Sequence, residues 1–210
     1  MPGLLVVSTH RQAPSVNGSI VVRRDHDVDP VAVTFLASCW IGHNDEMPVS
    51  VDTLRLQLDY SSWATQRLLD VAAKLPPEEL TRDFQTSDKC VLDTLVHIYA
   101  ADRIWLSRVL AEPRATFVDP EDRDLTLLQT EWPALHQRWK LWMRDFSDAD
   151  VAEKISFEDM RGNPYTKPVW QIVLHVVNHG THHRGQVSGF LRAMRHTPPP
   201  LDLMEYYMTL

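Results

Sequence analysis

The sequence predicts an all-α protein: a four-helix bundle with a long connection or a small hairpin before the last helix. Three observations support this prediction. Apolar residues recur at helical spacing in four segments from Ser50 onward. Prolines stand at or just beyond the ends of three of these segments, where they stop a helix. The segment before the last helix breaks the helical period and contains the turn sequence Arg161-Gly162-Asn163-Pro164.

The first two helices are expected at about residues 52–74 and 88–111. Pro76-Pro77 ends the first helix, and Pro113 lies just beyond the second. Thr86 or Ser87 is the expected N-cap of the second helix, because a hydroxyl there accepts a bond from a free backbone N–H. The predicted buried faces consist of Leu54, Leu58, Leu68 and Leu75 in the first helix, and Leu92, Leu95, Tyr99, Leu106 and Leu110 in the second.

The third helix has the most regular apolar spacing, with alternating steps of three and four residues. Such spacing is typical of the seam of an antiparallel bundle helix. Pro133 interrupts it, so the helix is either kinked there or begins near Thr130. The residues of this seam are Leu125, Leu128, Trp132, Leu135, Trp139, Trp142 and Phe146.

The fourth helix is expected at about residues 167–195, with Thr166 as its N-cap and Pro168 in its first turn. Before this helix, the segment from Lys154 to Lys167 is expected to be a long ordered connection that could form a small hairpin. Pro198-Pro199-Pro200 stops the helix.

Residues 1–46 differ from the rest because they show no sustained helical period. We expect an N-terminal extension of little structural value, translated from upstream of the true start, with a native, partly ordered arm as the alternative. Leu36-Ala37-Ser38-Cys39 resembles a lipoprotein cleavage box, but three aspartates separate the Arg23-Arg24 pair from the apolar run Val31–Ile41. That run has eleven residues, too few to cross a membrane. Residues 47–210 form the predicted bundle domain.

Composition narrows the classes of function. The 210 residues are 44% hydrophobic, enough for one domain with a substantial core. The net charge of -7, with no basic stripe, gives no reason to expect nucleic acid as a partner. Cys39 and Cys90 form no CxxC pair, which argues against a disulfide framework and a thiolate zinc site. We therefore expect a cytoplasmic protein with no membrane partner.

Four of the ten histidines lie within nine residues: His175, His179, His182 and His183. Positions four apart share a helix face, so both His175 with His179 and His179 with His183 suit a divalent metal. The alternative is a histidine-rich surface helix without a metal. The sequence contains no HExxH pattern, so it does not indicate a zinc protease of the HExxH class.

A tight site needs a third ligand, and the other histidines of the bundle region are His97, His136 and His196. His97 is the best candidate, since Ala100 and Ala101 would leave room beside it. His136 is expected to face solvent. His196 is expected at the end of a helix, where a positive charge interacts favourably with the helix dipole.

The segment from Asn178 to Gln186 resembles the closing motif of the DinB-like (YfiT-like) metal-binding superfamily. The segments Tyr60 to Leu69, Leu92 to Trp105 and Pro198 to Asp202 are similar to other parts of that family, so the resemblance covers about residues 50–210. It implies a divalent metal, either zinc, nickel, manganese or iron, held by His97, His179 and His183. It also implies that Arg184 and Gln186 order the helix or hydrogen-bond near the site.

Related enzymes use low-molecular-weight thiols such as bacillithiol or mycothiol. The resemblance therefore implies a thiol S-transferase whose partners are a small-molecule thiol and an electrophile. It does not identify catalytic residues, and it leaves open whether the protein forms a homodimer. Two alternatives remain: a metal-binding stress-response protein without turnover, and a metal-dependent hydrolase that uses water.

Overall fold

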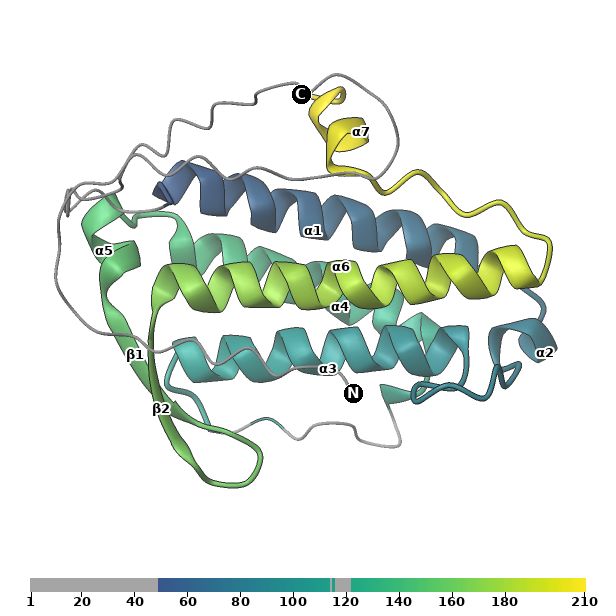
Figure 1. Cartoon of the computed structure of the whole chain (residues 1–210), viewed down its shortest axis with the longest axis horizontal. Helices are drawn as coiled ribbons and strands as arrows, with labels where there is room; N and C mark the ends of the chain where they lie inside the picture. Colours follow the sequence, from purple (N-terminus) through teal and green to yellow (C-terminus); the bar gives the residue numbers. More distant parts are fainter. Residues whose placement is uncertain (1–48, 114, 116–121) are drawn as a thin grey trace, which may run out of the picture. The chain divides into compact units, whose positions relative to one another are not determined.

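The computed structural model describes residues 49–113, 115 and 122–210. The long helices of the bundle are α1 (Val51–Ala72), α3 (Val91–Val109), α4 (Leu125–Met143) and α6 (Val169–Ala193) (Figure 1). Three short helices join or follow them: α2 (Pro77–Leu80), α5 (Asp148–Ala152) and α7 (Leu203–Tyr207). The strands β1 (Lys154–Glu158) and β2 (Pro164–Pro168) form an antiparallel hairpin directly before α6. The predicted all-α four-helix bundle and its hairpin are confirmed.

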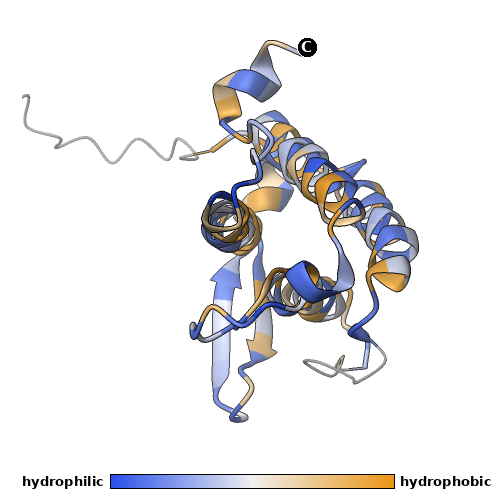
Figure 2. Ribbon diagram, turned by 90° about the vertical axis from the view of Figure 1, so that its right-hand side faces the viewer, coloured by the Kyte–Doolittle hydropathy of each residue, from blue (hydrophilic) through white to orange (hydrophobic). Residues whose placement is uncertain are grey.

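The core lies between the long helices. Helix α6 packs against both α1 and α3, and α4 covers the other side of the same two helices. Trp132 and Trp139 of α4 are almost fully buried, as are Leu68 of α1 and Leu95 of α3. Viewed along the bundle, the helices carry both apolar and polar residues, as amphipathic helices do (Figure 2). Each buried leucine contributes about 1.5–3 kcal/mol to stability.

Several helix ends differ from the sequence-based expectation. Helix α3 begins at Val91, and its N-cap is Cys90, whose Sγ accepts from the backbone N–H of Asp93 at 3.3 Å. The predicted Thr86 or Ser87 cap is wrong, because a turn at residues 84–89 precedes the helix. The predicted Thr166 cap of α6 is also wrong, since Thr166 lies in β2 and Pro168 takes the cap position.

Pro133 lies inside α4, which begins at Leu125. The alternative start near Thr130 is therefore wrong. Asp124 caps the helix through a hydrogen bond from the N–H of Thr126 at 2.8 Å, which places the start well before the proline.

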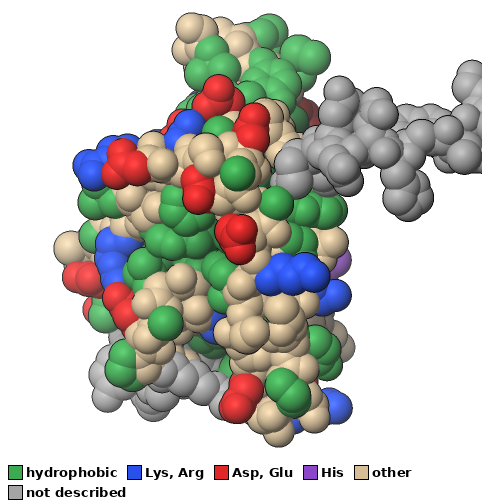
Figure 3. Space-filling model, turned by 90° about the vertical axis from the view of Figure 1, so that its left-hand side faces the viewer, with side chains coloured by type: hydrophobic (Ala, Val, Ile, Leu, Met, Phe, Trp, Pro, Cys, Tyr) green, Lys and Arg blue, Asp and Glu red, His purple; other side chains and the backbone are tan. Residues whose placement is uncertain are grey.

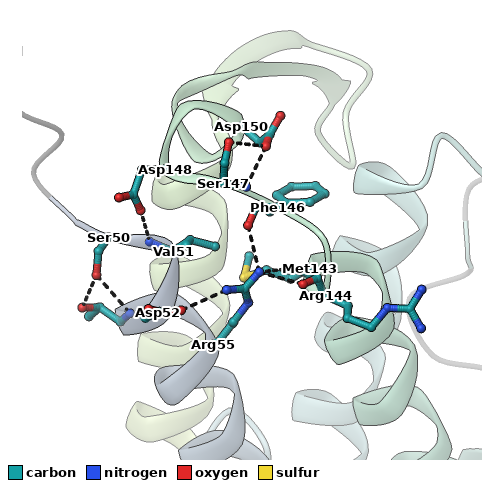
Figure 4. Close-up of polar contacts among 11 residues, drawn as sticks. Ser50, Val51, Asp52, Arg55, Met143, Arg144, Phe146, Ser147, Asp148 and Asp150 are labelled. Atoms are coloured by element: carbon teal, nitrogen blue, oxygen red, sulfur yellow. Dashed lines mark hydrogen bonds and ion pairs between the residues drawn. The ribbon is translucent and has the colours of Figure 1, made fainter.

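Arg55 of α1 secures the end of α4 (Figure 4). Its Nη2 donates to the carbonyls of Met143 at 3.1 Å, Arg144 at 2.7 Å and Phe146 at 2.8 Å. The last carbonyls of a helix have no partner within it, and a cation there also favours the helix dipole. A second link is the bond from the N–H of Val51 to Asp148 Oδ1 at 2.7 Å, so the start of α1 is held against the α4–α5 junction.

The face drawn in Figure 3 carries acidic and basic side chains interspersed among apolar ones. None of the helices in the described part of the chain is long and apolar enough to cross a membrane. The predicted extension at residues 1–46 and the segment around Cys39 lie outside the described residues, so their interpretation stays a prediction.

Candidate metal centre

His97 of α3 and His179 and His183 of α6 lie together in the bundle. Each offers one ring nitrogen, and these atoms lie within 4.8 Å of one another. The Nε2 atoms of His97 and His179 are 3.1 Å apart. The ring centroid of His183 lies 4.3 Å from that of His97 and 4.5 Å from that of His179. The four-residue spacing on α6 and the packing of α3 against α6 thus assemble the cluster.

These residues fit a divalent metal. Nitrogens bound to one tetrahedral zinc ion at about 2.0–2.1 Å are roughly 3.3 Å from each other. The 3.1 Å between the Nε2 atoms of His97 and His179 is close to that value. Two facing imidazole nitrogens repel unless a proton or a cation lies between them. Imidazole is a preferred ligand of zinc, nickel and iron.

The ring of His183 is oriented through its other nitrogen. Its Nδ1 lies 2.5 Å from Gln186 Oε1, an amide oxygen that only accepts. Nδ1 therefore carries the proton, and Nε2 is the nitrogen left for a metal. Asp88 also lies nearby, with Oδ2 3.4 Å from His183 Nδ1 and Oδ1 3.8 Å from His97 Nδ1. Sequence reasoning missed Asp88, which lies in the turn before α3.

Burial keeps the imidazoles of His97 and His179 neutral. Burial first, and then the neighbouring His183 and His97, lower the pKa of His179 to about 4. The pKa of His97 is also lowered, first by burial and then by His183, although the Asp88 carboxylate acts against this. Neutral imidazole is the form that binds a metal, so neither ring has to lose a proton at neutral pH.

The remaining histidines lie elsewhere. His175 is one turn from His179, with ring centroids 6.0 Å apart, and it packs edge-on against Trp105 at 4.9 Å. His182 is exposed on α6. His196, just beyond α6, contacts Glu79 of α2 through Nε2 and Oε2 at 2.5 Å.

The prediction that His136 faces solvent is wrong, since His136 is only 6% exposed. The reason is a buried carboxylate on the facing helix α3. Asp102 Oδ2 accepts from Trp132 Nε1 at 2.9 Å and lies 3.5 Å from His136 Nε2. A polar ring is tolerated inside the bundle because this carboxylate is beside it.

Arg184 is buried on the α1 side of α6, and Gln186 lies on the side of the histidine cluster. Arg184 Nη1 donates to Ser61 Oγ at 3.1 Å and Thr65 Oγ1 at 3.4 Å, and its guanidinium lies over the ring of Tyr60. Burial lowers the pKa of Arg184. Arg184 thus holds α6 against α1, whereas Gln186 contacts a histidine of the cluster.

Of the two alanines expected to leave space beside His97, Ala100 is fully buried and Ala101 is 8% exposed. Ala100 therefore belongs to the packed core. Ala101, one turn after His97, keeps the position expected for a residue beside a ligand.

Comparisons with known proteins agree with this architecture. The family model of the DinB family matches residues 47–209, a range that includes the three histidines. Protein DinB of Bacillus subtilis (strain 168) is 24% identical over 160 residues, which cover 72% of this chain and 92% of that protein. The crystal structure of a DinB-like protein from Bacillus cereus matches with a TM-score of 0.55 and 20% identity, over 72% of this chain and 97% of that chain. At that identity the structural likeness supports the fold alone.

Proposed function

Because the chain belongs to the DinB family, we propose that it is a metal-dependent enzyme that transfers a low-molecular-weight thiol to a small electrophile. The observation that supports this proposal best is the convergence of His97, His179 and His183 within 4.8 Å. The metal is a divalent ion, with zinc, nickel, manganese and iron as the candidates. We expect the enzyme to act in the cytoplasm, where such thiols are kept reduced.

The three histidines would hold the ion through one ring nitrogen each. Gln186 accepts the Nδ1 proton of His183, which leaves the Nε2 of this ring free to coordinate the ion. Three protein ligands leave at least one coordination position open. When bound, a divalent ion held by neutral ligands lowers the pKa of a thiol or water at that position.

The transfer itself is a substitution at an electrophilic carbon. The thiol gives up its proton to solvent, its sulfur forms a bond to that carbon, and the leaving group departs with the electron pair of the broken bond. A partly aromatic surface for a small electrophile would be formed by His175 and Trp105. His175 lies one turn before His179 in α6, and Trp105 lies about two turns after His97 in α3.

The first test is a metal analysis of purified protein. We expect one divalent ion per chain in the wild type and strongly reduced metal in His183→Ala. His182→Ala is the matched control, because His182 is the neighbouring residue and is exposed outside the cluster. Equal metal content in the two variants would refute the ligand assignment.

The second test separates the thiol reaction from its alternatives. Cobalt-substituted protein should change its absorption bands when a thiol such as bacillithiol or mycothiol is added, and it should conjugate that thiol to a model electrophile. Ester hydrolysis without a thiol response would favour a metal-dependent hydrolase. Metal binding with neither activity would favour a non-catalytic stress-response protein. Light scattering of the same sample tests whether it is a homodimer.

A further inference from the structure

We propose that Asp88 is a positioning residue of the metal site and that His97 and His183 share its single carboxylate. This inference rests on the proposed function, because it assigns a role to Asp88 only if the histidines hold a metal. Asp88 itself would not touch the ion. It would fix which nitrogen of each ring faces the ion.

The two oxygens of Asp88 face different rings. Oδ1 lies 3.8 Å from Nδ1 of His97, and Oδ2 lies 3.4 Å from Nδ1 of His183. In both rings Nδ1 is the nitrogen opposite Nε2. A carboxylate only accepts hydrogen bonds, so it favours a proton on Nδ1 and leaves Nε2 free to coordinate.

The surroundings of Asp88 make a purely structural role a poor explanation. Its side chain is 15% exposed, and its Oδ2 is buried without a hydrogen-bond partner among the described residues. Burying an unpaired carboxylate oxygen is unfavourable. Gln186 Oε1 already accepts from His183 Nδ1 at 2.5 Å, so Asp88 Oδ2 would be a second acceptor of the same N–H after moving about half an ångström closer. A positive ion beyond the two rings would favour that contact further, since the carboxylate offsets part of its charge.

The backbone holds Asp88 in this position at a conformational cost. Gln85 and Lys89, on either side of it, have φ angles of 58° and 56°, which side-chain-bearing residues rarely adopt. The N–H of Phe84 donates to the carbonyl of Lys89 at 2.7 Å and closes the turn. The ring of Phe84 stacks on Phe190 of α6 at 4.4 Å, which fixes the turn to the helix that carries His183.

The main experiment compares the zinc affinities of Asp88→Asn and Asp93→Asn by chelator competition at one pH. Asp93 is the matched control, because it lies five residues further on and pairs with Arg123 instead of a histidine. We expect Asp88→Asn to bind zinc about 10–100-fold more weakly than the wild type. We expect Asp93→Asn to stay within about twofold, as a carboxylate outside the site should. An affinity of Asp88→Asn equal to that of the control would overturn the proposal.

A spectroscopic test does not depend on whether the variant folds. In zinc-loaded wild-type protein, nitrogen NMR of labelled histidine should show a protonated Nδ1 and a coordinated Nε2 for both His97 and His183. Because Gln186 alone already favours a protonated Nδ1 in His183, the ring of His97 is the decisive one, and the opposite arrangement there would overturn the role of Asp88. Failure of the proposed function itself would appear differently, as a wild-type protein that binds no metal at all.

Discussion

Gly180→Ala should destabilise the protein, although alanine is the better helix former. Gly180 lies in α6 between two residues of the histidine cluster, and an added Cβ would lie 2.8 Å from Nη1 of Arg184. The guanidinium would have to move, yet Arg184 is only 2% exposed and has little free space. The displaced group is the one whose Nη1 donates to Ser61 and Thr65 of α1.

Two opposing free energies decide whether Gly180→Ala stabilises or destabilises the protein. Replacing glycine by alanine inside a helix stabilises the folded state by about 1 kcal/mol. Losing one hydrogen bond from a charged group costs about 1.5–3 kcal/mol, and the 3.1 Å bond from Arg184 to Ser61 is the one most directly strained. The net destabilisation of Gly180→Ala is therefore about 0.5–2 kcal/mol.

The assay is chemical denaturation of metal-free protein, with Gly189→Ala and Gly185→Ala as matched controls in the same helix. A Cβ at either control position meets nothing within 4 Å. Both controls should therefore raise the free energy of unfolding by up to about 1 kcal/mol. If Gly180→Ala stabilises the protein as much as Gly189→Ala does, the argument from the buried guanidinium is wrong.

Three further predictions concern other parts of the chain. A protein that begins at Met47 should melt cooperatively and bind undiminished metal, measured by calorimetry and metal analysis; aggregation would show that residues 1–46 belong to the core. In a Cys39→Ser variant, native Cys90 should react with a thiol reagent far more slowly than after unfolding, since the residue is 1% exposed and burial raises its pKa above the ordinary 9.0. A raised pKa moves ionisation of the thiol to higher pH, so the reaction rate of Cys90 should rise at a more alkaline pH than the rate of a free cysteine. A rise at the same pH as for free cysteine would contradict the burial of Cys90. Ala101→Leu should keep metal and fold but weaken the response of the cobalt protein to thiols, and a response equal to that of the wild type would remove Ala101 from the site.

Sequence patterns predicted the long helices well because each buries one continuous apolar face. The start of α3 was placed too early because its cap is Cys90, a residue type that rarely caps helices. His136 was misjudged for a different reason. It lies four residues after Trp132 and three before Trp139, so the same periodicity that marked the buried face also included His136. Because histidine is polar, His136 was not counted with the apolar residues of that face. Asp102, the partner that makes the burial of His136 tolerable, lies on another helix.

The three histidines of the cluster could be predicted from the sequence. The four-residue spacing of His179 and His183 is visible in one segment, and His97 was the best third candidate because of its alanine neighbours before the family resemblance pointed to the same residue. Asp88 carries no such spacing, because it belongs to a turn whose shape depends on positive φ angles at Gln85 and Lys89. Glutamine and lysine rarely adopt such angles, so the residue types around Asp88 do not indicate this turn.

The placement of His183 and Arg184 side by side in α6 limits how this chain can change in length. Consecutive helical residues point about 100° apart, and here one reaches the cluster with α3 while the next reaches α1. Inserting one residue earlier in α6 would turn both away from their partners at once, so evolution can exchange amino acids there more easily than it can add or delete them. At the hairpin tip, residues 160–163 are exposed and Asp159 is partly buried, so this segment can change in length most easily. Loop grafts and inserted tags are therefore better tolerated there than anywhere in α6.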